Sequence, residues 1–392
     1  MNSTATASTS AAHFRSIHGT ENEVLARAPG RIEFIGNHTD YNGGLVAGAA
    51  IDRYVFAAAG KRTDRRLVFA SEFSSGTATC ELDAREKFEG PNSWANYPLG
   101  VFSSMRKLGL RADAGFNLGI VSDLPSGAGL SSSAALELAS ALAIGTLFGE
   151  KPSPEELVAI GRAAENEFLS LPSGPLDQSV CAHGRENRLV FVDCRNLNVY
   201  LAPLPPESRI LIFNTGVTHS LVDSLYSTRH GECAEILRLL RAEIPELEYL
   251  VDAPEFALTK LPAGTPEPLV NRARHVIREN TRVIAARTAL EQGDPARVGS
   301  LLAESHESSR TLFENSCPEL DLIAGLLNDH PHVYGARLSG GGFGGAVTAL
   351  VSENFGDKDA RSLGNRYRMA HGREPEILAC NVANGAELVA GI

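Results

Sequence analysis

The chain is organised around the segment Leu124-Pro-Ser-Gly-Ala-Gly-Leu-Ser-Ser-Ser-Ala-Ala-Leu-Glu137. An alternating apolar run at 115–121 predicts a strand before it, and a run at 134–148 that is apolar on nearly all sides predicts a buried helix after it. Gly127 and Gly129 permit tight turns and leave backbone N–H groups uncovered. With the free N–H groups of the helix start, these amides favour a bound phosphate. The serines can cap the helix, contact phosphate or ligate Mg²⁺, although the segment alone also fits an ordinary serine-capped glycine turn.

Length and composition are those of an ordinary globular protein with room for two domains. The chain has 392 residues, of which 43% are hydrophobic and 21% charged. Lys and Arg number 36 against 47 Asp and Glu, which gives a formal charge of −11. This acidic balance argues against a nucleic-acid or anionic-membrane partner. We therefore expect small-molecule partners, and we expect a monomer.

Cysteine usage and the N-terminal residues predict a cytoplasmic protein. Six cysteines are scattered with neither zinc-site spacing nor a disulfide framework, so we expect reduced thiols. The first dozen residues are rich in Ser, Thr and Ala and lack the basic start and apolar core of a signal peptide. We expect residues 1–20 to form a disordered tail.

A second informative segment, Pro29 to Gly44, is polar, turn-rich and dense in reactive side chains. It includes Arg31, His38 and Asp40, and it lies between a short predicted strand and an apolar run. We expect a loop that lines a site, although a solvated loop would carry similar residues.

Periodicity predicts the remaining elements. Strands are expected at 24–28, 54–59, 67–71, 189–192 and 209–214, and helices at 94–108, 154–171, 224–241, 273–291, 295–309 and 318–329. The proline-rich, polar segment 203–208 is the best candidate for a domain boundary. Trp94, the only tryptophan, is more typical of a core than of a base-stacking platform, and Glu165 also fits a solvated helix face.

A third glycine-rich segment, Gly340 to Gly345, formally matches the spacing of the dinucleotide-binding fingerprint. That fingerprint must open a helix, whereas a β-type run follows here at 346–351. The glycines instead indicate close approach of the backbone to a ligand or to the other domain. The sequence contains no Walker-type, protein-kinase or nucleophile-elbow motif, so a nucleotide would need a different phosphate-binding loop.

Taken together, the three glycine-bearing segments resemble, in order and spacing, the three motifs of the GHMP small-molecule kinases. Residues 29–44 are similar to the galactokinase signature Gly-Arg-x-x-x-Ile-Gly-x-His-Thr-Asp-Tyr-Asn-Gly-Gly. Further galactokinase-like pieces are Trp94-Ala-Asn-Tyr97, Asp177-Gln178, Ala273-Arg-His-Val276 and Cys317-Pro-Glu-Leu-Asp321. The resemblance covers about residues 24 to 390.

The resemblance implies an α+β GHMP kinase fold with the active site in a cleft between two domains. The N-terminal domain, residues 21–204, would be of the ribosomal-protein-S5-like type and would carry the sugar signature and the phosphate loop. The C-terminal domain, residues 205–392, would be a ferredoxin-like α/β domain with the third glycine motif. The implied reaction uses ATP and Mg²⁺ to phosphorylate the anomeric C1 hydroxyl of a galactose-like sugar.

The resemblance also implies residue roles by position. Asp177 falls at the catalytic carboxylate and Arg31 at its partner, whereas Ser132 and Glu165 fall where the family binds Mg²⁺. The sugar contacts fall on Asn37, His38, Asp40, Gly174 and Tyr226. The ATP contacts fall on Trp94, Ser126, Gly127, Gly129, Leu130, Ser131, Ser132 and Ser133, and the third motif on Gly340, Gly341 and Gly342.

These residue types suit phosphoryl transfer, in which a protein mainly positions the reactants and neutralises charge. Asp177 suits either acceptance of the anomeric proton or orientation of the hydroxyl, and Arg31 would favour its ionised form. Asp40 and His38, with opposed acceptor and donor capacity, suit a diol on the sugar.

Two positions depart from the signature. Most galactokinases have glutamate where this chain has Asn37, and asparagine where it has Glu33. A neutral amide at position 37 would remove a negative charge near the outer sugar hydroxyls and would tolerate a carboxylate at C6. The principal hypothesis is therefore a galactokinase, and the alternative is a 1-kinase for a C6-modified sugar such as galacturonate.

Two other classes of protein share parts of this pattern. A galactokinase-like sugar sensor would bind ATP and sugar without turnover, but its serine loop is typically damaged, whereas residues 129–135 are complete here. A mevalonate- or homoserine-type kinase shares the glycine loops but lacks the sugar signature.

Overall fold

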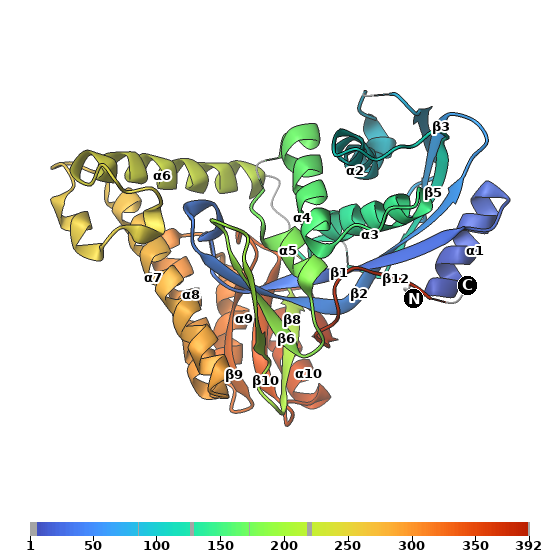
Figure 1. The fold of residues 1–392 in the computed structure, drawn as a ribbon. Coiled ribbons are helices and arrows are strands. Elements are labelled where there is room, and N and C mark those ends of the chain that lie inside the picture. The colour runs from blue at the N-terminus through green and yellow to red at the C-terminus, as the bar shows by residue number, and fades with distance from the viewer. Residues whose placement is uncertain (1–5, 85, 126–128, 172, 218–221, 391–392) are drawn as a thin grey trace.

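The computed structural model describes residues 6–84, 86–125, 129–171, 173–217 and 222–390. Two β-sheets organise the molecule, and helices cover both of them (Figure 1). In this described part of the chain, no helix combines the length and apolar character needed to cross a membrane.

The first sheet has eight strands, with the path β12-β1-β2-β5-β3-β4 and with β6 and β7 attached beside β2. Its strands are β1 (Val24–Ile35), β2 (Leu45–Lys61), β3 (Arg66–Ser71), β4 (Thr77–Glu81), β5 (Phe116–Ser122), β6 (Arg188–Asp193), β7 (Val199–Pro203) and β12 (Glu387–Leu388). One face is packed by α3 (Ser132–Leu147) and α5 (Leu176–His183), and α2 (Asn96–Lys107) and α4 (Pro154–Ala163) lie against α3.

The second sheet has four antiparallel strands in the order β11-β8-β10-β9. They are β8 (Ser208–Asn214), β9 (Val333–Ser339), β10 (Ala346–Ser352) and β11 (Glu376–Cys380). Helices α9 (Pro318–Asn328) and α10 (Asp357–His371) share one core with this sheet, and α7 (Glu267–Glu291) and α8 (Pro295–Ser308) pack on the other side. The strand order is that of a split β-α-β-β-α-β unit, so the predicted ferredoxin-like arrangement is confirmed.

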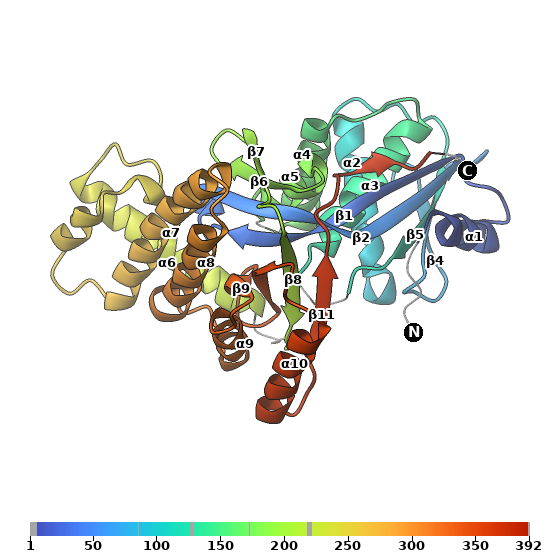
Figure 2. The same cartoon turned by 90° about the horizontal axis from the view of Figure 1, so that it is seen from below.

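A helical extension completes the molecule. Helix α6 (Val222–Glu243) packs with α7 and with two short 3₁₀ turns, Leu250–Asp252 and Glu255–Lys260, around a core of their own. Figures 1 and 2 show α6 and α7 at one end of the molecule and α1 (Ala7–His18) at the other.

The prediction that residues 1–20 form a disordered tail is wrong for those of them that the structure describes, residues 6–20. Residues Ala7–His18 form helix α1, which begins with a capping box between Thr6 and Thr9. Phe14 is fully buried against β2 and β5, where Gly60 and Gly119 leave room for its ring. This Ser/Thr/Ala-rich segment therefore forms a helix that is capped at its start and buries Ser10, Ala11 and Phe14.

The segment predicted as a loop at 29–44 is half strand. Strand β1 continues to Ile35, and the loop occupies only 36–44, with a 3₁₀ turn at Asp40–Asn42. Ile32 and Phe34 are fully buried, whereas the alternate residues Arg31 and Glu33 line a cavity. Successive side chains of a strand face opposite sides, so a strand between a core and a polar cavity has a polar residue at every second position. This alternation made the segment resemble a polar loop in the sequence.

The chain passes from the first sheet to the second between β7 and β8, within the segment expected to be the boundary. It then returns, because β12 pairs with β1 through Leu388 opposite Ala26 and Glu387 opposite Arg27. Residues 205–392 therefore include a short segment that belongs to the first sheet.

Candidate active site

Asp177 is held between two segments that are distant in the sequence. It lies in the first turn of α5, and its Oδ1 accepts hydrogen bonds from Nε and Nη2 of Arg31 at 2.8 and 2.6 Å. Its Oδ2 accepts a hydrogen bond from the Ser131 hydroxyl. The Arg31 guanidinium also donates to the Gly129 carbonyl at 2.6 Å. The structure thus brings Arg31, Asp177 and the serine-rich turn together, as the sequence predicts.

The serine-rich turn leaves the start of α3 without a side-chain cap. Ser131 has a left-handed backbone with φ of 55°, and because its hydroxyl is committed to Asp177 it makes no capping hydrogen bond. Ser132, the first residue of α3, is exposed. Free N–H groups and the positive end of the helix dipole make such a terminus a good anion site.

The other predicted ATP contacts in this turn divide into two groups. Leu130 is buried, and its carbonyl accepts a hydrogen bond from the backbone N–H of Arg31 at 3.0 Å, which joins the turn to β1. Ser126 and Gly127 lie outside the described residues, so the structure gives no account of them.

A cavity of about 420 Å³ opens beside the Arg31–Asp177 pair. Its lining includes all five predicted sugar-contact residues together with Glu33, Tyr97 and Glu165. The predicted site residues that line it are Arg31, Asn37, His38, Asp40, Ser133, Glu165, Gly174, Asp177, Tyr226, Gly340 and Gly341. The third glycine motif is the hairpin between β9 and β10, and Gly342 lies behind the wall, where a Cβ would be 2.1 Å from the Asn315 carbonyl.

Asp40 is a partly buried carboxylate in the cavity wall. Burial, which removes water from its charged form, raises the pKa of Asp40 to about 7. Gly174 faces it so closely that a Cβ at position 174 would lie 2.0 Å from Oδ2 of Asp40. Position 174 therefore has to be glycine for Asp40 to keep this position.

His38 has both ring nitrogens occupied by protein groups. Nδ1 lies 2.9 Å from the Tyr41 hydroxyl, and Nε2 lies 3.2 Å from the Gly341 carbonyl. Because a carbonyl can only accept, Nε2 carries the proton and Nδ1 accepts from the tyrosine. Burial lowers the pKa of His38 to about 3, so the ring is neutral. His38 lines the cavity, but the ring N–H that was expected to donate to a sugar diol already donates to the Gly341 carbonyl.

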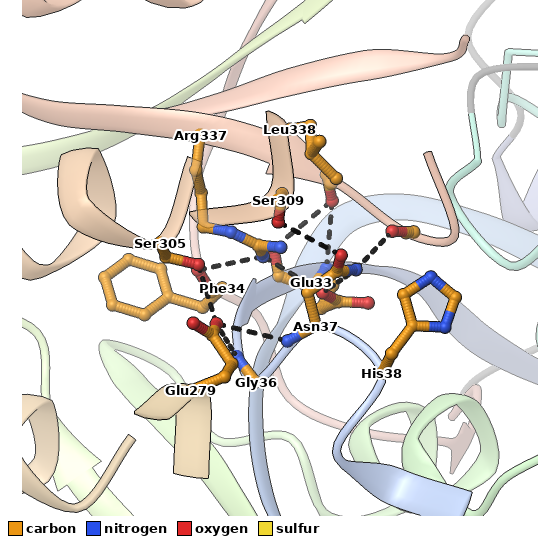
Figure 3. A network of polar contacts seen from close by, with 12 residues as sticks. Glu33, Phe34, Gly36, Asn37, His38, Glu279, Ser305, Ser309, Arg337 and Leu338 are labelled. Atoms are coloured by element: carbon orange, nitrogen blue, oxygen red, sulfur yellow. Dashed lines mark hydrogen bonds and ion pairs between the residues drawn. The ribbon is translucent and has the colours of Figure 1, made fainter. Parts of the chain in front are cut away.

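Asn37 lies in a polar network that connects the two sheets (Figure 3). Its side chain donates to Glu33 at 3.0 Å and to the Gly340 carbonyl at 2.7 Å. Glu33 in turn pairs at 3.0 Å with Arg337 of β9, whose side chain is fully buried. The expectation that Asn37 leaves this part of the cavity without a negative charge is wrong, because the Glu33 carboxylate lines the same cavity.

Two residues that hold the cavity wall in place were not identified from the sequence. Glu279 of α7 is fully buried, and its Oε1 accepts hydrogen bonds from the backbone N–H groups of Gly36 and Asn37 at 3.1 and 3.2 Å and from the Ser305 hydroxyl at 2.6 Å. Arg337 is the second. In the sequence, Arg337 could have been noticed as a single charged residue between the apolar residues Ala336 and Leu338.

Glu165 lies in a π-helical turn, Ala164–Leu169, that continues α4. It is 6% exposed, and the Ser173 hydroxyl donates to its Oε2. The neighbouring Glu137 is fully buried, and burial followed by the nearness of Glu165 raises its pKa well above the usual value. The hydrogen bond from Ser173 therefore fixes the Glu165 carboxylate at the cavity wall. The alternative prediction, that Glu165 lies on a solvent-exposed helix face, is wrong.

A second cavity of about 750 Å³ adjoins the first. Ser133 and Tyr97 line both cavities, and Ser132 lines the second. Its remaining wall mixes polar and apolar residues and includes Trp94, which lies in the 3₁₀ turn Gly90–Ala95 before α2 and also packs on the core. The two cavities therefore meet at the start of α3.

Comparison with known proteins gives the family. The galactokinase galactose-binding signature matches residues 12–61, the GHMP kinase N-terminal domain residues 96–185 and the GHMP kinase C-terminal domain residues 286–368. The galactokinase of Roseiflexus sp. (strain RS-1) is 37% identical, with 95% of this chain and 94% of the relative aligned. The galactokinase of Thermotoga maritima is 40% identical over 89% of this chain and 95% of its own length.

Solved structures agree with the sequence relatives. The structure of Lactococcus lactis galactokinase complexed with galactose superposes with a TM-score of 0.91 and 31% identity, covering 97% of this chain and 99% of that one. A mevalonate kinase structure, with a TM-score of 0.66 and 18% identity, shares the fold alone. On its signature, its sequence relatives and its architecture, this chain belongs to the galactokinase family of the GHMP kinases.

Proposed function

We propose that this protein is an ATP-dependent sugar 1-kinase that converts D-galactose and ATP to galactose 1-phosphate and ADP. The observation that carries the proposal is the Arg31–Asp177–Ser131 cluster at the junction of two cavities. The smaller cavity, whose wall carries four carboxylates, suits the hydroxyls of a hexose, and the larger cavity, whose wall includes Trp94, suits a nucleotide. A phosphate chain joining them would pass the uncapped start of α3.

In this arrangement the C1 hydroxyl of the sugar faces Asp177, which can accept its hydrogen bond and take or share its proton as the oxygen attacks the γ-phosphorus. Arg31 holds the carboxylate in place and offsets charge that spreads over the transferred oxygens. The bond between the γ-phosphorus and the bridging oxygen breaks, and ADP leaves with that oxygen. Asp40 lines the same cavity as an acceptor for sugar hydroxyls.

Mg²⁺ fits the donors available at this junction. Glu165 offers a held carboxylate, and Ser132 offers an exposed hydroxyl beside the helix terminus. Mg²⁺ in kinases keeps several waters and takes one or two protein ligands besides the phosphates, so two such donors suffice. When bound with ATP, the ion would neutralise charge on the phosphate oxygens.

A sugar panel tests the proposal. The ratio kcat/KM should be measured through ADP release with galactose, galacturonate, N-acetylgalactosamine and arabinose. We expect galactose to give the highest value. A large preference for galacturonate would reject the galactose assignment, and binding of galactose without ADP release would identify a sugar sensor instead.

A further inference from the structure

The side chain of Asn37 has no hydrogen-bonding capacity left for a ligand. Its amide nitrogen donates to Oε1 of Glu33 at 3.0 Å and to the Gly340 carbonyl at 2.7 Å. Its amide oxygen accepts from Nδ2 of Asn315 at 2.7 Å and from the Ser309 hydroxyl at 3.3 Å. A primary amide has two N–H donors and two lone pairs, so all its positions are filled. A sugar hydroxyl could bind Asn37 only by displacing a protein group.

The carboxylate of Glu33 is fixed at one oxygen and open at the other. Oε1 accepts from Asn37 and from Nη1 of Arg337, at 3.0 Å in each case. Oε2 accepts no hydrogen bond from any residue that the structure describes, and Glu33 lines the smaller cavity. An ionised carboxylate oxygen accepts a hydroxyl hydrogen bond more strongly than a neutral oxygen does. Figure 3 shows Glu33 between Asn37 and Arg337, which together set its orientation.

The position of Glu33 on β1 places it away from the reacting end of the cavity. Arg31 and Glu33 are two residues apart on one strand, so their side chains project from the same face about 6.7 Å apart along it. Arg31 marks the end of the cavity where Asp177 lies. A hexose whose C1 hydroxyl faces Asp177 would therefore present its far side, the part remote from C1, to Glu33.

The charges of the cavity wall favour a neutral sugar. Glu33, Asp40, Glu165 and Asp177 line it, and Arg31 is the one cation among the described lining residues. Arg337 lies behind Glu33 and is fully buried, so it cannot meet a ligand carboxylate directly. A negatively charged group on the far side of the sugar would face the open oxygen of Glu33.

We propose that Glu33 is a specificity-determining residue of this enzyme. Its open carboxylate oxygen accepts a hydrogen bond from a hydroxyl on the side of the sugar remote from C1, and its charge excludes sugars that carry a carboxylate there. Asn37 serves as the scaffold that orients Glu33. The inference rests on the proposed function, because it takes the C1 hydroxyl to lie at Asp177.

Substitution of Glu33 tests the inference, with Kd from calorimetry and kcat and KM from ADP release for galactose and galacturonate. Glu33→Gln keeps the size of the side chain and removes its charge. We expect Kd and KM for galactose to rise about tenfold to a hundredfold, because a hydrogen bond to a charged group is lost. We expect a much smaller change in kcat and at least a tenfold fall in the preference for galactose over galacturonate.

Two further variants keep the result interpretable. Glu33→Asp preserves the charge and a partner for Arg337, so we expect it to weaken galactose binding while still excluding galacturonate. Glu232→Gln is the matched control, because Glu232 of α6 is a carboxylate that accepts a hydrogen bond from Arg272 at 2.9 Å and does not line the cavity. We expect it to lower the melting temperature and leave the galactose-to-galacturonate ratio unchanged.

The outcomes separate the inference from the proposed function. Unchanged galactose affinity and an unchanged ratio in Glu33→Gln would overturn the inference while wild-type turnover of galactose upholds the function. If Glu33→Gln fails to fold, unchanged galactose affinity in Glu33→Asp would overturn it. If the wild type releases no ADP with any sugar, the proposed function fails, and the calorimetric affinities still decide the role of Glu33.

Discussion

Asp177 is held in position by hydrogen bonds to both of its carboxylate oxygens. Two nitrogens of Arg31 donate to Oδ1, and the Ser131 hydroxyl donates to Oδ2. A carboxylate held in this way has a fixed orientation toward the cavity before any ligand arrives. Preorganised charge of this kind is a main source of rate enhancement in phosphoryl transfer, where positioning and electrostatics dominate.

From the pKa of Asp40 we predict a pH dependence of sugar binding. Since burial raises its pKa to about 7, a fraction of the free enzyme carries a neutral Asp40 at neutral pH. We expect KM for galactose to fall as pH rises from 6 to 8, because the ionised carboxylate is the better acceptor. Initial rates across this range check the prediction, and a flat KM profile would contradict it.

The same residue predicts a stability effect of definite sign. The folded state holds the Asp40 proton more tightly than the unfolded state, so the contribution of this group to stability falls as pH rises from about 4 to about 7. Asp40→Asn removes the effect. We expect its melting temperature to exceed that of the wild type by more at pH 8 than at pH 5, with sugar binding impaired; an equal difference at both pH values would count against the raised pKa.

Most residues that line this cavity were predicted from the sequence. Which of their side chains have hydrogen-bonding groups free for a ligand was not. Asn37 and His38 fall in the predicted place, and both are occupied by protein partners. Glu33 and Tyr41 are local partners, but Gly340 and Gly341 of the β9–β10 hairpin and Asn315, between α8 and α9, are more than 200 residues away in the sequence. Hydrogen-bond saturation depends on tertiary contacts, and no local pattern reveals it.

Hydrophobic periodicity predicted the strands and helices with long apolar patterns, and glycine content predicted the three glycine-bearing turns. The misjudged elements were those whose stability comes from contacts elsewhere. Strand β1 continues through a polar stretch because Ile32 and Phe34 enter the core on its other side. Helix α1 forms because β2 and β5 supply a surface for Phe14, and β12 forms because β1 has a free edge.

Helix α1 supplies a prediction about stability. Phe14 is fully buried in a cluster with Leu25, Phe56, Ala58 and Val121. We expect Phe14→Ala to lower the free energy of unfolding by about 3–5 kcal/mol, as large-to-small changes in cores do. Ile17→Ala on the same helix is the control, because Ile17 is 40% exposed. Urea unfolding checks the prediction, and equal effects of the two variants would show that α1 does not contribute through Phe14.

Across the whole molecule, the two sheets share one core and one polar network. Residues of β2, β8, α7 and α8 belong to a single hydrophobic cluster. Glu33 pairs with Arg337, and Glu279 accepts hydrogen bonds from the loop after β1, so both sheets fix the walls of the smaller cavity. The site is therefore complete only when both sheets are folded and docked.

Shared packing predicts cooperative unfolding. Trp94, the only tryptophan, reports on the first sheet and its helices, whereas far-UV circular dichroism reports on the entire chain. We expect the two signals to change at the same urea concentration, which is a test of all-or-none unfolding. A tryptophan transition that precedes or follows the dichroism change would show that the two sheets unfold separately.

We propose that one crevice, with Asp177 at its centre, phosphorylates the sugar. The most direct measurement is galactose-dependent ADP formation by the wild type and by Asp177→Asn, with melting temperatures confirming that both are folded. We predict that kcat falls by at least roughly two orders of magnitude in the variant, as removal of a general base or of a fixed orienting carboxylate would require. Near-normal turnover in folded Asp177→Asn would contradict the account.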